Sequence, residues 1–156
     1  MPNIDIETRI SSPQASVAPR LETVLRGYAQ QDNVTLALGL PLGGAEVAVP
    51  VTIETHAAEV RNAFEVPLTL RATQHALMFP TFDGEVRSLA GGPLESTLRL
   101  TGTYTAPLGA IGSLGDGTVL GHAAERTLRS FLERVRADTI EEIQRSELDV
   151  RMRLRA

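Results

Sequence analysis

One long run of helical periodicity constrains the fold of this 156-residue chain more than any other feature. Between about residue 113 and about residue 146, apolar side chains recur three or four positions apart, which places them on one stripe of a helix. The stripe consists of Leu120, Ala124, Leu128, Phe131, Leu132 and Val135. Arginine and glutamate occupy positions between them, as on a solvated helix face. The sequence therefore predicts a long amphipathic helix whose apolar stripe packs against another element.

Most of the chain before this helix alternates apolar and polar residues, which is the period of a β-strand with one buried face. These runs cover residues 4–10, 34–40, 47–54, 64–72, 82–89 and 94–104. A break at Ser11–Pro13 is followed by helical spacing over residues 17–28, which predicts one or two short helices. The tail Arg151–Arg155 alternates again, and it is expected either to fray or to add to a sheet edge.

The order of these elements predicts an α+β fold. A curved antiparallel sheet wrapped around the long C-terminal helix, with short helices after the first strand, buries every apolar row at once. At 1.5 Å per residue, a helix of about 30 residues spans about 45 Å, which is enough to cross such a sheet. No internal repeat, low-complexity tract or linker divides the sequence, so residues 1–156 are expected to form a single domain.

Composition and charge exclude several classes of function. The chain carries 15 Lys and Arg residues against 19 Asp and Glu residues, a net charge of -4, so nucleic acid is not an expected partner. There is no cysteine, which excludes disulfides and thiolate metal sites. The histidines are far apart, and only His122 and Glu125 have a spacing that suits two ligands on one helix face, so no metal and no other cofactor is expected.

Two further absences in the sequence bear on location. The first residues lack the basic and apolar regions of a secretory signal. No apolar run approaches the roughly 20 residues that a membrane-spanning helix needs. The sequence therefore predicts a cytoplasmic protein without a transmembrane segment.

Three segments resemble a known family: Phe79-Pro80-Thr81-Phe82-Asp83-Gly84-Glu85, the run from Leu98 to Gly109, and the helix from Ala124 to Val135. Together with the order of elements, they are similar to a bacterial branch of the START-like, or SRPBCC, superfamily, which has the helix-grip fold. The resemblance implies a cavity between the sheet and the C-terminal helix that takes up an apolar small molecule. It does not decide between carriers, sensors and enzymes, because this fold serves all three.

The first hypothesis for function is a non-enzymatic carrier or sensor that binds an apolar or amphipathic small molecule, such as a lipid, in this cavity. The inward rows are mainly aliphatic, and aromatic residues make up only 4% of the chain, so few rings are available to fill a wide concave sheet. The residues expected to line the site are Phe64, Leu68, Leu70, Phe82, Leu100, Tyr104, His122 and Phe131. The alternative is that the same residues fill a packed core, with a structural or partner-binding role for the domain.

A second hypothesis is an enzyme of the polyketide cyclase or dehydratase kind, which needs two polar groups within reach of one bound molecule. Tyr104, on an inward row beside Gly102, and His122, early in the long helix, are the candidate pair. Asp83 and Glu85 share a strand face, but the alternation turns them outward, and Asp83-Gly84 is typical of a turn. No nucleophile and base recur at a known spacing, so a non-enzymatic role is favoured.

Overall fold

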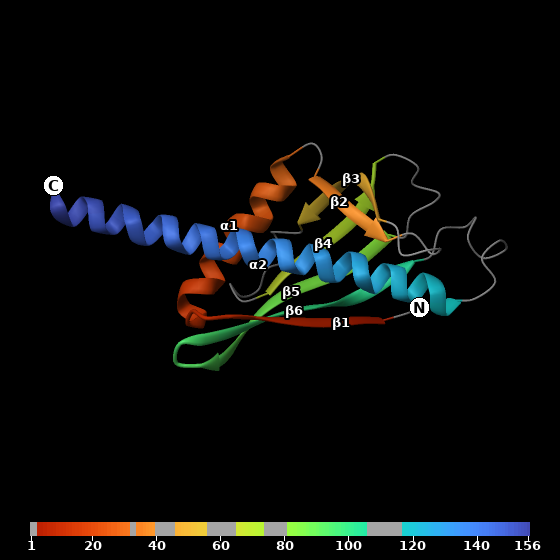
Figure 1. Cartoon of the computed structure of the whole chain (residues 1–156), viewed down its shortest axis with the longest axis horizontal. Coiled ribbons are helices and arrows are strands. Elements are labelled where there is room, and N and C mark those ends of the chain that lie inside the picture. Colours follow the sequence, from red (N-terminus) through yellow and green to blue (C-terminus); the bar gives the residue numbers. More distant parts are fainter. Residues whose placement is uncertain (1–2, 32–33, 40–45, 56–64, 74–80, 106–116) are drawn as a thin grey trace.

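The elements expected from the sequence are present in a computed structural model, which describes residues 3–31, 34–39, 46–55, 65–73, 81–105 and 117–156. In chain order they are β1 (Asn3–Ile10), α1 (Gln14–Gln30), β2 (Val34–Gly39), β3 (Glu46–Thr55), β4 (Glu65–Ala72), β5 (Thr81–Gly92), β6 (Glu95–Thr105) and α2 (Gly117–Arg155) (Figure 1). The strands follow the alternating runs of the sequence, and α2 contains the long apolar stripe. The predicted α+β class is confirmed.

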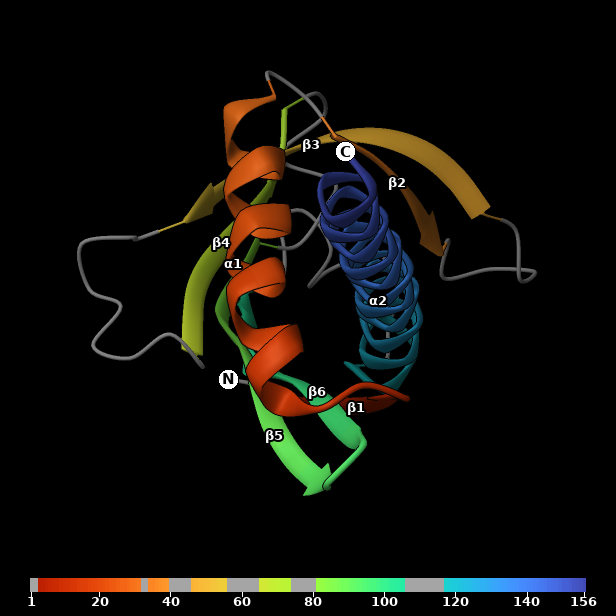
Figure 2. The same ribbon diagram turned by 90° about the vertical axis from the view of Figure 1, so that its left-hand side faces the viewer.

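The strands form one antiparallel sheet in the order β1-β6-β5-β4-β3-β2. Pairing of β1 with β6 brings the start of the chain beside the last strand, with Ile4 opposite Gly102. β1 and β2 are the edge strands of this described sheet. The sheet is strongly curved, and Figure 2 shows α2 lying across its concave side, between the two edges. This is the predicted arrangement of a curved sheet around the C-terminal helix.

Alternation along the strands decides which side chains face the helices. On β1 the buried residues are Ile4, Ile6 and Ile10, while the residues between them are more exposed. On β6 the same pattern buries Leu98, Leu100 and Tyr104. From α2 the stripe that meets this face includes Leu128, Phe131, Leu132 and Val135. The core therefore sits between the concave face of the sheet and the helices.

A single helix follows the first strand. α1 spans Gln14–Gln30 without interruption, and Pro19 lies inside it. Its buried residues are Val17, Ala18, Leu21, Leu25 and Tyr28, which follow helical spacing. Figure 2 shows α1 and α2 side by side over the concave face, so the lid of the sheet has two helices rather than the one long helix that the sequence emphasises.

The end of α2 differs from the prediction. The tail Arg151–Arg155 was expected to fray or to join a sheet edge, but α2 remains helical to Arg155. Figure 1 shows this end projecting beyond the sheet. Helical residues continue the hydrogen-bond ladder without needing a tertiary partner, so the alternating sequence does not prevent a helix here. No helix in the described residues is long and apolar enough to cross a membrane.

The turn expected at Asp83-Gly84 is also wrong, because both residues lie inside β5. Asp83 pairs with Thr69 of β4, whose hydroxyl donates a hydrogen bond of 2.6 Å to the Asp83 carboxylate. Gly84 faces Gly102 of β6 across the other side of the strand. Pairing on both sides therefore overrides the local turn preference of an Asp-Gly sequence.

Candidate functional site

Most of the residues predicted to line a ligand site lie on the concave face of the sheet or on the stripe of α2 that faces it. Leu68 and Leu70 lie on β4, Phe82 on β5, Leu100 and Tyr104 on β6, and Phe131 on α2; each is at most 5% exposed. Phe64 lies outside the described residues. His122 lies on α2 and is exposed.

Strand register arranges these side chains in rows across the sheet. Leu70 lies opposite Phe82, and Phe82 lies opposite Tyr104, so three strands contribute to one row. Because cross-strand neighbours on one face are about 4.5–5.5 Å apart at Cβ, their side chains contact one another. The predicted residues of β4, β5 and β6 therefore form a continuous surface.

The next row contains two facing glycines, Gly84 and Gly102. A Cβ atom on Gly84 would lie 2.6 Å from Cζ of Phe82, and one on Gly102 would lie 2.7 Å from the same atom. The end of the Phe82 ring thus covers both glycines. The Phe82 ring therefore takes the space that a side chain at position 102 would need beside Tyr104.

Two hydroxyl groups interrupt this apolar wall. Tyr104 is 4% exposed, and its phenolic ring lies in the row with Leu70 and Phe82. Ser88 is 1% exposed on the same face of β5, two residues beyond the buried Val86, and its Oγ has no hydrogen-bond partner in the part of the chain that the structure describes. Buried hydroxyls normally have a partner, so Ser88 is a candidate for contact with a polar group of a ligand, and Tyr104 offers a second hydroxyl in the same wall.

Sequence reasoning found Tyr104 but missed Ser88. The signal for Ser88 was present, since it is the polar member of the inward row Phe82, Gly84, Val86 and Ser88. It was hidden because serine on a strand is ordinarily assigned to the solvated face. Its backbone carbonyl accepts a hydrogen bond of 2.8 Å from Nε2 of Gln14, which places Ser88 beneath the start of α1.

The pair proposed for acid–base chemistry is split between two environments. Tyr104 is buried on β6, whereas His122 is exposed near the start of α2. No group of three or more His, Asp and Glu side chains that could hold a metal ion occurs among the described residues. The catalytic role of the Tyr104–His122 pair stays a prediction.

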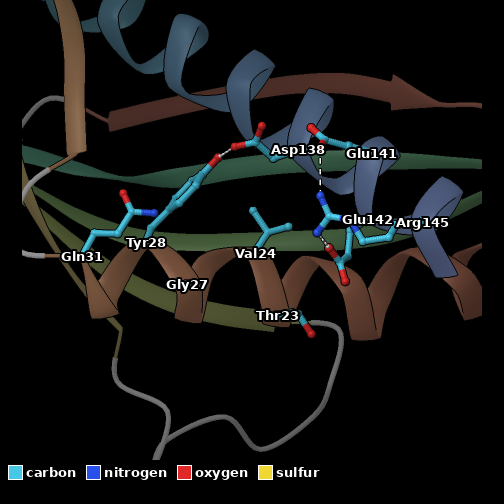
Figure 3. A pocket seen from close by; sticks show the side chains of 9 residues that line it. All are labelled: Thr23, Val24, Gly27, Tyr28, Gln31, Asp138, Glu141, Glu142 and Arg145. Atoms are coloured by element: carbon cyan, nitrogen blue, oxygen red, sulfur yellow. Dashed lines mark hydrogen bonds and ion pairs between the residues drawn. The ribbon is translucent and has the colours of Figure 1, made fainter. Parts of the chain in front are cut away.

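A separate groove, with a volume of about 370 Å³, lies between α1 and α2 (Figure 3). It is lined by Thr23, Val24, Gly27, Tyr28, Gln31, Asp138, Glu141, Glu142 and Arg145. Arg145 donates hydrogen bonds to Glu141 and Glu142 at 3.0 and 3.1 Å, so one cation is shared by two carboxylates. Four charged side chains line it, unlike the predicted ligand cavity, and it lies between the two helices instead of between sheet and helix.

Tyr28 joins this groove to the core. Its hydroxyl donates a hydrogen bond to Oδ2 of Asp138, and its ring lies 6.4 Å from that of Phe131, centroid to centroid. The guanidinium carbon of Arg134 lies 5.6 Å from the ring centroid of Tyr28, within cation–π distance. These contacts stabilise the packing of α1 against α2. Sequence reasoning missed them because Tyr28 and Asp138 are 110 positions apart.

The Tyr28 phenol is expected to titrate above the ordinary range of tyrosine. Burial raises its pKa, and the hydrogen bond to the Asp138 carboxylate raises it further. The folded chain therefore holds this proton more tightly than the unfolded chain, so folding stability should fall as the pH rises above about 10. The chain has two tyrosines and no tryptophan, so phenolate absorbance can follow each tyrosine.

In this titration Tyr28→Phe should remove the ionisation that lies above the ordinary range of tyrosine. The same Tyr28→Phe change should make the free energy of unfolding less dependent on pH above about 10. If Tyr28→Phe leaves the absorbance change above the ordinary range of tyrosine unaltered, the contact between Tyr28 and Asp138 is not as described.

Comparisons with known proteins bear on the fold. No protein-family model and no curated protein matches the chain. Among solved structures, a conserved protein from Geobacillus kaustophilus matches with a TM-score of 0.57 and 13% identity, over 90% of this chain and 96% of that one. A protein from Thermus thermophilus matches with a TM-score of 0.54 and 15% identity, over 90% of this chain and 99% of that one. A START superfamily protein from Mycobacterium smegmatis matches with a TM-score of 0.49 and 9% identity, over 89% and 97% of the two chains.

Likeness at these identities concerns the fold alone. The order of elements, the antiparallel sheet and the long C-terminal helix are those of a helix grip. The chain has the helix-grip fold that the sequence predicts.

Proposed function

We propose that this protein is a non-enzymatic carrier or sensor that binds an apolar or amphipathic small molecule between the concave face of the sheet and α2. The observation that carries the proposal is Tyr104, which is 4% exposed and brings a phenolic hydroxyl into a wall of buried apolar side chains. The residues proposed to line the site are Phe64, Leu68, Leu70, Phe82, Leu100, Tyr104, His122 and Phe131. The cytoplasmic location predicted from the sequence is part of the same proposal.

The chemistry of the wall favours an amphipathic ligand. Each Å² of apolar ligand surface removed from water stabilises a complex by about 25 cal/mol, and the lining supplies aliphatic and aromatic contacts for it. A polar ligand group that reaches the Tyr104 hydroxyl would add a hydrogen bond and give direction to the binding. A purely apolar ligand would gain only the first of these two contributions.

A catalytic role is the less favoured reading. Acid–base catalysis needs two polar groups that reach one bound molecule. Tyr104 is buried on β6, whereas His122 is exposed on α2, which does not support their joint action on one reacting atom. Binding without a reaction needs only the wall and one polar contact, so it is the simpler account of the same residues.

The proposal is tested with two fluorescent probes, the apolar N-phenyl-1-naphthylamine and the carboxylate-bearing cis-parinaric acid. Both should show saturable uptake. Tyr104→Phe should weaken binding of cis-parinaric acid by about 2- to 12-fold, which corresponds to the loss of one hydrogen bond, and should change the apolar probe less. Tyr28→Phe is the matched control, because it removes a phenolic hydroxyl outside the proposed site.

Two results would count against this account. Absence of saturable uptake of either probe would remove the proposed binding function. An equal effect of Tyr104→Phe and Tyr28→Phe on cis-parinaric acid would leave a binding site but remove the proposed role of Tyr104.

A further inference from the structure

The exposed end of α2 is helical, but its sequence has the alternating pattern that is typical of a strand. Every residue from 147 to 156 is exposed. The large apolar side chains are the alternate ones, with exposures of 58% for Leu148, 56% for Val150, 69% for Met152 and 81% for Leu154. In a helix, residues two apart point in nearly opposite directions, so these four form no single stripe. In a strand they would share one face, and the charged residues between them would share the other.

The helical state of this end gains little from the rest of the protein. Helix ends without tertiary packing are only marginally stable in water, because most helical stability in proteins comes from packing of a buried face. The tail, defined here as residues 147–155, therefore unwinds at little cost. A partner that offers strand pairing to the tail can compete with its helical state.

Edge strand β1 offers such pairing. It pairs with β6 on one side only, and its other side is the edge of the described sheet. Nε of Arg136 donates a hydrogen bond of 2.6 Å to the Arg9 carbonyl, so the backbone of Arg9 faces away from β6. Because backbone groups alternate along a strand, those of Glu7 and Asp5 face the same free edge. Arg136 would have to release the Arg9 carbonyl for pairing to extend that far.

We infer that the tail of one copy of this chain adds to β1 of a second copy as an antiparallel strand. In one register each of the three charged residues of β1 lies opposite a tail residue of opposite charge, and three of the four apolar tail residues lie opposite an apolar residue of β1. On the outer face it pairs Arg153 with Asp5, Arg151 with Glu7, and Asp149 with Arg9. On the inner face it pairs Leu154 with Ile4, Met152 with Ile6, Val150 with Thr8, and Leu148 with Ile10.

Charge selects this orientation and this edge. A parallel alignment of the same segments would set Asp149 against Asp5 and Arg153 against Arg9, and directly opposed like charges destabilise a strand pair. The other edge strand, β2, contains no charged residue and cannot match the tail in this way.

The acidic residues of β1 also have room for another cation. Asp5 and Glu7 both face Arg99, at 2.5 and 3.6 Å, so a single arginine serves two carboxylates. Their side chains remain 53% and 54% exposed. Arginines from an added strand would complete the charge balance on this face.

The partner is a second copy because each tail points away from its own β1. Thr8 donates a hydrogen bond of 2.7 Å to Glu133, and Arg136 contacts Arg9, so this part of α2 lies beside the end of β1. The tail begins 11 residues after Arg136, or about 16 Å farther along the helix axis. Two copies related by a twofold axis can exchange both tails, which closes the assembly and covers both β1 edges.

The first experiment is sedimentation equilibrium of the full chain. It should show a concentration-dependent dimer whose dissociation constant rises by at least about tenfold in Arg151→Glu/Arg153→Glu, since four charge pairs per dimer become repulsive. Arg126→Glu/Arg129→Glu is the matched control, because it makes the same change in charge on exposed positions of α2 outside the tail. A monomer at all concentrations, or equal weakening by both variants, would overturn the proposal.

The second experiment uses the absence of cysteine in the chain. Thr8 and Val150 would occupy a non-hydrogen-bonded pair, with Cα atoms about 4.5 Å apart, which suits a disulfide. A mixture of the Thr8→Cys and Val150→Cys variants should oxidise to a mixed disulfide dimer. The control is a mixture of the Thr8→Cys and Met152→Cys variants, whose cysteines are out of register. Its yield of mixed disulfide dimer should be at least about tenfold lower. A disulfide within one chain of the Thr8→Cys/Val150→Cys double variant would show that the tail folds onto its own β1 instead, and would overturn the assignment to a second copy.

Discussion

Replacement of Phe131 by alanine is expected to lower the free energy of unfolding by about 3–5 kcal/mol. Phe131 is fully buried on α2, and its ring lies 6.4 Å from that of Tyr28, so it joins both helices to the core. Its removal loses apolar burial and leaves a cavity that rigid elements on both sides prevent from closing. Urea unfolding followed by circular dichroism measures the change, with an unaltered slope as a sign that the unfolding mechanism is the same.

The matched control is Leu94→Ala, because Leu94 is 76% exposed in the turn between β5 and β6. Truncation there should change the free energy of unfolding by no more than about 0.5 kcal/mol. A loss of less than about 1 kcal/mol for Phe131→Ala would mean that Phe131 does not contact a packed interior.

Gly102→Ala is expected to lower the free energy of unfolding by about 3 kcal/mol, the upper part of the range for overpacked sites. The new Cβ atom would lie 2.3 Å from the Asp83 carbonyl oxygen and 2.6 Å from the Gly84 Cα atom. Both are backbone atoms of the neighbouring strand, so the two strands must move apart and the Phe82 ring must leave its place. Urea unfolding again measures the change.

A glycine-to-alanine substitution on α1 is expected to raise the free energy of unfolding instead of lowering it. A Cβ atom on Gly27 meets no heavy atom within 4 Å. Gly27→Ala should therefore stabilise the protein by about 0.5–1 kcal/mol, because alanine is the better helix former. If Gly102→Ala proved as harmless as Gly27→Ala, the close approach of β5 and β6 would be wrong.

Periodicity predicted the framework of this fold because it reports burial directly. Alternation in β1 identified Ile4, Ile6 and Ile10 as core residues, and helical spacing in α2 identified Phe131 and Val135; all of these are buried. In each case one face of the element is covered along most of its length. The sequence pattern then has a single physical cause, which is contact with the core.

The tail of α2 shows where the same reasoning fails. Alternation suggested a frayed or strand-like segment, but nothing in the described chain covers this end, and helical hydrogen bonds continue to Arg155. Likewise, Asp83-Gly84 has the local preference of a turn, yet the hydrogen bond from Thr69 and the close approach of Gly102 hold it in a strand. Local patterns do not contain these long-range contacts.

The candidate site was predictable in part for the same reason. Leu68, Leu70 and Leu100 were assigned to the inner wall from strand alternation, and strand register brings them near one another. The helix-to-helix groove was not predicted, because Tyr28 and Asp138 meet only when α1 and α2 pack. Which hydroxyls lack a partner depends on every neighbour in space, so Ser88 needed a structure to be noticed.

Native mass spectrometry of gently purified protein, before and after extraction with organic solvent, tests the central claim most directly. If the chain carries an apolar or amphipathic molecule, the native mass should exceed the sequence mass by a few hundred daltons, and extraction should remove the excess. The extracted compound would then identify the ligand class. Protein that is bare from the start, and that takes up neither a fatty acid nor a hydrophobic probe afterwards, would contradict the proposed binding function.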